Sequence, residues 1–102
     1  MISIKFNLNS EDKLLADEIN ALDRDKIKSV ISKGLFGSEE ITIAIIAAAP
    51  GLIAQIASVI KNYIDRNNSK SFTLKIDDKE MSFTGYSVDE IDEILLKYGK
   101  HD

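Results

Sequence analysis

Few residues of this chain have both the chemical type and the spacing that catalysis requires. The chain has no cysteine and one histidine, His101, which is next to the C-terminal residue. A general base must be held rigidly within hydrogen-bond reach of its substrate, and we expect residues 100–102 to form a frayed tail that cannot do this. Without cysteine there is no thiol nucleophile, disulfide scaffold or Cys-ligated zinc. The sequence therefore predicts a protein that is not an enzyme.

The acidic and glycine-containing clusters are better explained by local structure than by ligand binding. Asp77 and Asp78 lie where we expect a hairpin turn, which favours aspartate for conformational reasons. The segment 34–37 is a G-x-x-G without flanking basic residues, which indicates a turn and not a phosphate loop. Four further acids occupy neighbouring positions of a predicted helix and so point in different directions: Asp89, Glu90, Asp92 and Glu93. We expect no metal site and no cofactor.

The charge balance argues against a nucleic-acid partner. Thirteen basic and 17 acidic side chains give a formal net charge of −4. A nucleic-acid-binding surface needs clustered cations, and here lysines alternate with acids.

The N-terminus, MISIKFNLNS, has no uninterrupted apolar core of a signal peptide, so we expect a cytoplasmic protein.

The length of 102 residues predicts one domain, residues 1–102. Apolar and polar residues alternate over 2–8, which predicts a strand, and again over 72–84, which predicts a β-hairpin. Ser87 and Glu90 form a capping-box pattern ahead of a helix that we expect to end near Gly99. Helical spacing of apolar residues over 9–34 predicts one bent helix or two short ones.

The uncharged stretch from Ile41 to Ile60 leaves two interpretations open. A helix of about 20 residues is long enough to cross a bilayer. Pro50-Gly51 interrupts the stretch, however, and its second half is amphipathic. We therefore favour a buried helix at 38–49, a Pro-Gly joint and an amphipathic helix at 51–67. The alternative is a small membrane-inserted protein that uses residues 41–64 as a helical hairpin or a spanning helix.

Together these elements predict an α+β fold, with a three-stranded, mainly antiparallel sheet made of the N-terminal strand and the C-terminal hairpin. The helices would pack on one face. Small residues four apart allow another backbone to approach closely. The partner-interface candidates are these small residues together with one aromatic residue late in the apolar stretch: Ala47, Gly51, Ala54, Ser58 and Tyr63.

The order of elements over residues 34–98 resembles the small effector-associated constant components of bacterial conflict systems. The segments that carry the resemblance are an Ala-rich stretch, a hairpin and a closing helix: ITIAIIAAAPGLIAQIASVIKNYIDRNNS, SFTLKIDDKEMSFTG and YSVDEIDEILLKY. The resemblance implies a non-catalytic adaptor or regulator of antiviral defence, linked to a variable effector such as a protease or a TIR domain. We accordingly expect an apolar helical surface that binds a separately encoded effector, or a second copy of the chain in an oligomer.

Overall fold

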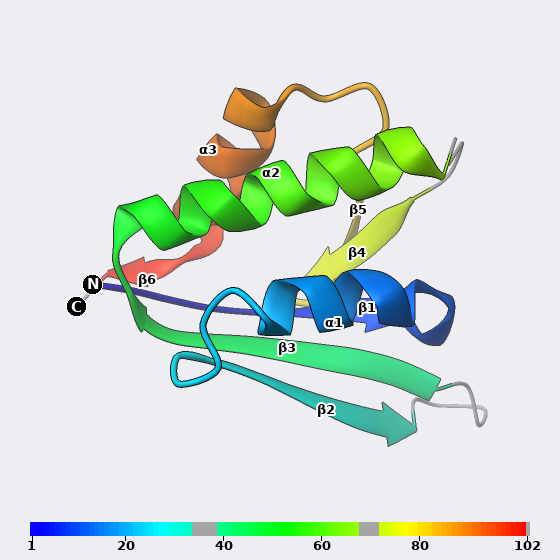
Figure 1. Ribbon diagram of the computed structural model, residues 1–102, viewed down its shortest axis with the longest axis horizontal. Helices are drawn as coiled ribbons and strands as arrows, with labels where there is room; N and C mark the ends of the chain where they lie inside the picture. Colours follow the sequence, from blue (N-terminus) through cyan, green and yellow to red (C-terminus); the bar gives the residue numbers. More distant parts are fainter. Residues whose placement is uncertain (34–38, 68–71, 102) are drawn as a thin grey trace.

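The protein is an α+β domain in which three helices cover one face of a six-stranded antiparallel sheet, as seen in a computed structural model (Figure 1). The structure describes residues 1–33, 39–67 and 72–101. The strands are β1 (Ile2–Asn9), β2 (Ile27–Lys33), β3 (Glu39–Ala48), β4 (Thr73–Ile76), β5 (Lys79–Ser82) and β6 (Lys100–His101). The helices are the 3-10 turn η1 (Ser10–Asp12), α1 (Lys13–Asn20), α2 (Pro50–Arg66) and α3 (Val88–Tyr98).

The sheet has the order β2-β3-β1-β4-β5, and β6 pairs with the beginning of β1. Because β1 is antiparallel to both β3 and β4, and β2 is antiparallel to β3, the pairs β1/β2 and β3/β4 each run in the same direction. Helix α1 connects the first of these pairs and α2 the second, and one strand lies between the members of each. This is the split β-α-β arrangement, used twice, with the β4–β5 hairpin, α3 and β6 added.

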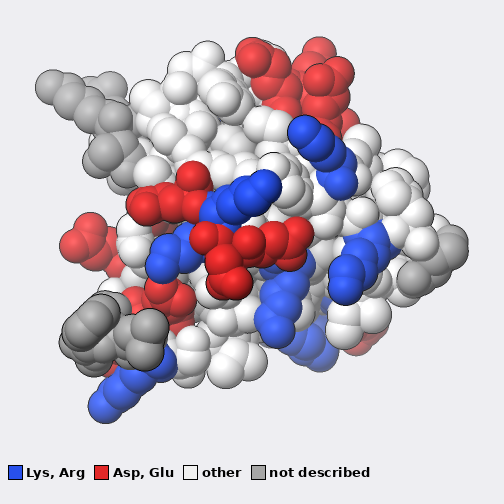
Figure 2. Space-filling model, turned by 180° about the vertical axis from the view of Figure 1, so that it is seen from behind, with Lys and Arg blue, Asp and Glu red and all other residues white. Residues whose placement is uncertain are grey.

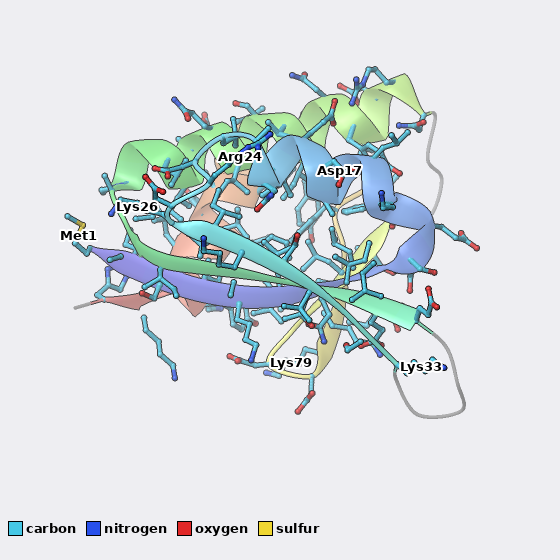
Figure 3. The ribbon with its side chains drawn as sticks, turned by 60° about the horizontal axis from the view of Figure 1, so that its bottom comes forward. Met1, Asp17, Arg24, Lys26, Lys33 and Lys79 are labelled. Carbon is cyan, nitrogen blue, oxygen red and sulfur yellow. The ribbon has the colours of Figure 1, made fainter. Side chains whose placement is uncertain are left out.

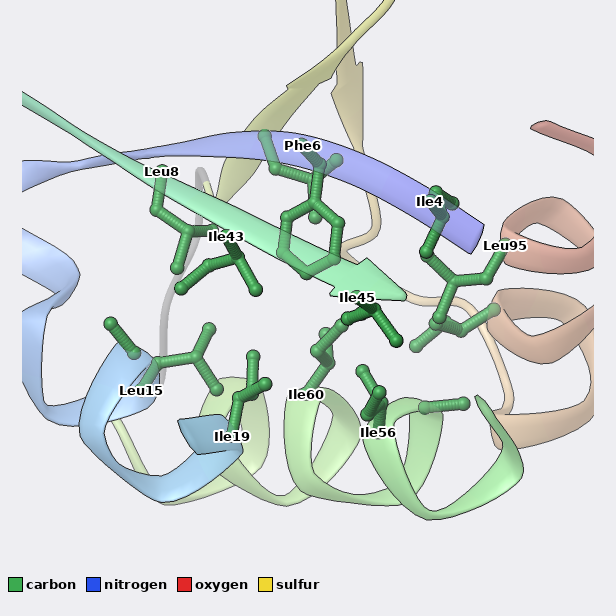
Figure 4. Packing of buried hydrophobic residues seen from close by; sticks show 14 of the residues in the cluster. Ile4, Phe6, Leu8, Leu15, Ile19, Ile43, Ile45, Ile56, Ile60 and Leu95 are labelled. Atoms are coloured by element: carbon green, nitrogen blue, oxygen red, sulfur yellow. The ribbon is translucent and has the colours of Figure 1, made fainter. Parts of the chain in front are cut away.

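The core lies between the sheet and the helices, and the strand pattern explains it. Every second residue of β1 is buried, from Ile2 to Leu8, and the same is true of β3 at Ile41, Ile43 and Ile45. Their side chains meet those of α1, α2 and α3, including Leu15, Ile19, Ile56, Ile60 and Leu95 (Figure 4). The alternate residues of both strands face away from the helices.

The prediction of a three-stranded sheet is wrong, although the α+β class is confirmed. Residues 38–49 were expected to form a buried helix, and 39–48 form strand β3. Isoleucines 41, 43 and 45 follow a period of two, but Ala44 between them and Ile46 after them are also apolar, which hides that period and makes the run resemble a helix. The β-branched side chains of the isoleucines favour the strand, which pairs on both sides.

The second half of the predicted helical region, residues 27–33, is strand β2. The apolar residues there, Ile27, Val30 and Ile31, have helical spacing, but only Ile27 is buried. Helix α1 is confirmed over residues 13–20. The turn that we predicted at 34–37 lies outside the described residues.

The predicted frayed tail is also wrong at residues 100 and 101, which pair with Ser3 and Ile2 as β6. Gly99 makes this possible, because a Cβ atom there would lie 2.7 Å from Cγ2 of Ile2. The sequence pattern could not show that the chain end returns to the first strand.

Other expectations are confirmed. Pro50 begins α2, where its missing N–H costs nothing, so the chain changes direction there as predicted. The hairpin places Asp77 and Asp78 at φ 52° and 64°, as a two-residue hairpin turn requires. Ser87 Oγ accepts a hydrogen bond from the Glu90 N–H at 3.2 Å, and Glu90 Oε1 accepts one from the Ser87 N–H at 3.1 Å, which completes the capping box.

Candidate interaction surface

The five predicted interface residues do not form one surface. Ala47 lies in β3, so its spacing from Gly51 is not that of two residues on one helix. Tyr63 is nine residues beyond Ala54, which is two and a half turns of α2 and so places the two on opposite sides of the helix. Ala54 and Ser58 are half-buried and Gly51 is exposed. An interface role for these residues stays a prediction.

Ala47 is held by contacts within the fold. The pairing of β1 and β3 shifts register between Ile2 and Ile4, and Ala47 adopts φ 53° at this bulge. Its N–H donates to Ser3 Oγ at 3.0 Å, and its carbonyl accepts a hydrogen bond from Lys26 Nζ at 2.9 Å. The bulge lies where the chain passes from β3 towards α2. Ile46 is exposed because, by strand alternation, it points away from the helices.

Tyr63 connects α2 to the segment before α1. Its hydroxyl donates to Asp12 Oδ1 at 2.7 Å, while 7% of the residue is exposed. Burial, followed by this hydrogen bond to a carboxylate, raises the pKa of the Tyr63 hydroxyl to about 12. Arg66 binds both carboxylate oxygens of Glu18 on α1, at 2.8 and 2.7 Å. These contacts span an open groove between the two helices, lined in part by Glu18, Tyr63 and Arg66, and hold α1 against α2.

Two further findings concern metal binding and membrane insertion. Within residues 1–33, 39–67 and 72–101, no three His, Asp or Glu side chains gather closely enough to hold a metal ion. No helix in these same ranges has both the length and the apolar character needed to span a membrane. Basic and acidic side chains are intermixed on the face seen from behind (Figure 2).

The exposed apolar residues point to a different surface from the one predicted. The large hydrophobic side chains that are most exposed are Met1, Leu14, Val30, Ile31 and Ile46. Two of them, Val30 and Ile31, are neighbours in β2 and are 61% and 58% exposed. Because successive strand residues point to opposite faces, one lies on each side of the sheet. Isolated exposed apolar residues are ordinary, whereas an adjacent pair on an outer strand is a candidate contact surface.

Strand β2 is at the outer end of the sheet, and β3 is its neighbour on one side (Figure 1). Among the described residues no strand pairs with its other side. All residues after Ile27 are exposed. We call residues 28–33 the β2 edge. Its free backbone groups and exposed apolar side chains make it a template for pairing with another chain.

The sequence carried a signal for this surface that periodicity did not reveal. Three β-branched apolar residues alternate irregularly with serine, and lysines stand near both ends: Ile27, Lys28, Ser29, Val30, Ile31, Ser32 and Lys33. The lysines match the charges with which natural proteins protect exposed strand edges.

Comparison of the chain with protein-family models, with curated proteins and with solved structures finds no match.

Proposed function

We propose that this chain is a non-enzymatic adaptor or regulatory module of a bacterial conflict system, which binds a separately encoded effector protein. Two arguments support this function. The order of elements over residues 34–98 resembles that of effector-associated constant components, and the side chains that could do chemistry are scattered or engaged in structural contacts. The lone histidine, for example, is in the exposed strand β6.

The observation that carries the proposal is the exposure of both Val30 and Ile31, one on each face of the sheet, on an outer strand. The predicted apolar helical surface has less support, because the central apolar residues of α2 face the core: Ile53, Ile56, Ala57 and Ile60. We therefore assign effector binding to the β2 edge. The membrane alternative also has less support, since residues 41–48, which it requires to be helical, lie in a central strand.

Co-expression with the product of a neighbouring reading frame tests this function. A tagged effector-like protein should retain the chain during affinity purification. Changing Val30→Thr together with Ile31→Thr removes apolar surface but keeps β-branched side chains, so the strand should persist. We expect retention to fall by about tenfold, as for loss of a small apolar hot spot.

Leu14→Gln is the matched control, because Leu14 is 71% exposed on α1, where it lines the groove between α1 and α2, and glutamine is a good helix former. This variant should be retained like the unaltered chain. Equal retention of all three proteins would show that the β2 edge is not the binding surface. Recovery of the chain only in carbonate-resistant membranes would instead favour the membrane-inserted alternative.

A further inference from the structure

We propose that the β2 edge binds an extended segment of the partner as an additional strand, and that this segment carries acidic residues beside its apolar ones. The inference rests on the proposed function, because it specifies how the effector would be held. It is carried by the direction of the β2 backbone groups, by the contrast with the opposite edge of the sheet, and by the local charge.

The backbone of β2 alternates between its neighbour β3 and the free side. The N–H of Ile46 donates to the carbonyl of Lys26 at 2.9 Å, which makes these two residues a directly hydrogen-bonded pair. In an antiparallel ladder such pairs recur at every second residue, so Lys28, Val30 and Ser32 also bond to β3. The intervening residues Ser29, Ile31 and Lys33 therefore direct their N–H and C=O groups outward.

A hydrogen bond in the preceding turn supports this assignment at the start of the strand. The N–H of Ile27 donates to the carbonyl of Asp23 at 3.0 Å, in the turn before β2, and so does not bond to β3. Ile27, Ser29 and Ile31 are alternate residues of one strand, so their backbone N–H and C=O groups point to the same side. The β2 edge thus offers outward-facing donors and acceptors at three successive alternate positions, which is the arrangement that an added strand requires.

The other end of the sheet is less suited to this role. Strand β5 has four residues, Lys79–Ser82, and β2 has seven. Lys79 and Glu80 are exposed charged residues at its start, and Met81 is half-buried. Short, charged edges are the usual protection against strand pairing. Exposed apolar side chains on both faces of the sheet distinguish β2 from it.

The charge near β2 selects the kind of partner. The chain as a whole has a net charge of −4, but between Arg24 and Lys33 it has four basic residues, Arg24, Lys26, Lys28 and Lys33, and one acidic residue, Asp25. Arg24 and Lys26 lie before the start of β2 and Lys33 lies at its end (Figure 3). Lys28 Nζ donates to the backbone carbonyl of Arg24 and has no carboxylate partner within the described residues. Lys26 Nζ is bound to the carbonyl of Ala47, and Glu39 lies opposite Lys33 in β3. Within β2 itself, Lys28 and Lys33 are the cations that acidic side chains on an added strand would meet.

The same charges disfavour a second copy of the chain as the occupant. Two β2 strands paired antiparallel about Val30 would place Lys28 of one copy opposite Ser32 of the other, and Lys33 opposite Ile27. No acid of either strand would then neutralise the four lysines of the two strands. An acidic segment of another protein removes this repulsion and gains opposite-charge pairs across the strands.

Selection from a display library of random 12-residue peptides, with the full chain as the target, tests the inference. We expect the selected peptides to combine Asp or Glu with Val, Ile or Thr. Their binding to Ser29→Pro should be about tenfold weaker, because proline removes one outward N–H and adds bulk at the edge. Ser29→Ala is the matched control and should bind them normally. Proline is tolerated at a solvent-facing edge position, and the unfolding midpoint of the variant verifies that it is folded.

A charge reversal provides a second variant that does not depend on proline. Lys28→Glu together with Lys33→Glu should weaken the binding of the acidic peptides by about tenfold. A new selection with this double variant as the target should enrich lysine and arginine in the peptides. Peptides that bind Ser29→Pro and Ser29→Ala equally, peptides without acidic enrichment, or no selected binder would overturn the inference. A dimer of the unaltered chain that Ser29→Pro dissociates would overturn it in favour of self-pairing.

Failure of this inference is distinguishable from failure of the proposed function. If effector retention depends on Val30 and Ile31 but no acidic strand-forming peptide is selected, the adaptor function stands and the binding mode is different. If such peptides are selected but no neighbouring effector is retained, the strand site stands and the adaptor function fails.

Discussion

Truncating Ile43 and Ile46 separately tests whether residues 39–48 form a strand. The two residues are three positions apart, so a helix would place both on the same face, as in the expected buried helix at 38–49. In β3 they differ fully: Ile43 is 0% exposed and Ile46 is 59% exposed. The two interpretations therefore predict different costs for the same chemical change.

The magnitude follows from the surroundings of each side chain. Ile43 pairs with Phe6 in the sheet and lies in the core opposite α1 and α2 (Figure 4). Changing a fully buried isoleucine to alanine lowers the free energy of unfolding by about 3.5 kcal/mol, from lost apolar burial and the residual cavity. Ile46→Ala removes exposed surface and should change it by less than about 0.5 kcal/mol.

Urea unfolding followed by circular dichroism measures both effects. A domain of this size has a free energy of unfolding of about 5–15 kcal/mol. The loss expected for Ile43→Ala is therefore a large fraction of the total, and the variant should still be folded enough for its unfolding to be measured. The slope of the free energy against urea should stay the same in both variants. Similar losses for Ile43→Ala and Ile46→Ala would refute the strand assignment and favour a helix that buries both.

Two further predictions concern single contacts: the hydrogen bond from Tyr63 to Asp12 and the close approach of Gly99 to Ile2. Tyr63→Phe removes the hydrogen bond to Asp12 and should lower the free energy of unfolding by about 1.5 kcal/mol at neutral pH. Because the pKa of Tyr63 is raised to about 12 in the folded state from 10.0, its contribution is complete below pH 10 and is lost as the pH rises towards 12. Denaturation at pH 7 and pH 11.5 should therefore show a smaller difference between Tyr63→Phe and the unaltered chain at the higher pH, and an unchanged difference would contradict the folded-state pKa. Gly99→Ala places a Cβ atom 2.7 Å from Ile2 Cγ2, so it should destabilise by about 1–3 kcal/mol, as overpacking does, and speed amide exchange in β6. Thermal unfolding and exchange at residues 100–101 measure this, and unaltered values would mean that β6 does not pack on β1.

The elements that could be predicted are those whose signal is local. The capping box at Ser87 and Glu90 defines its helix through contacts three residues apart, and the turn at Asp77 and Asp78 needs only its own backbone geometry. The alternation over 2–8 shows a strand with one buried face. In each case, the residues that determine the structure are the residues that display the pattern.

The apolar centre and the interaction surface depended on distant partners. Whether 41–46 form a helix or a strand is decided by β1 and β2 on either side, which satisfy the backbone of β3 and bury alternate isoleucines. Likewise Ile31 is four residues after the buried Ile27, the spacing of two core residues on a helix. It is a surface residue because β2 is the outermost strand.

Composition and spacing by themselves determined an α+β domain, its N-terminal strand, its hairpin, its last helix and the break at Pro50, because each is encoded in contacts along the chain. Only the tertiary structure decided that the first part of the uncharged stretch, residues 41–48, is a strand, that residues 100 and 101 join the sheet, and that Val30 and Ile31 are exposed on an outer edge. The physical reason is that hydrogen bonding and burial of a strand are supplied by neighbours far away in sequence, so its place in the sheet is set by the whole fold.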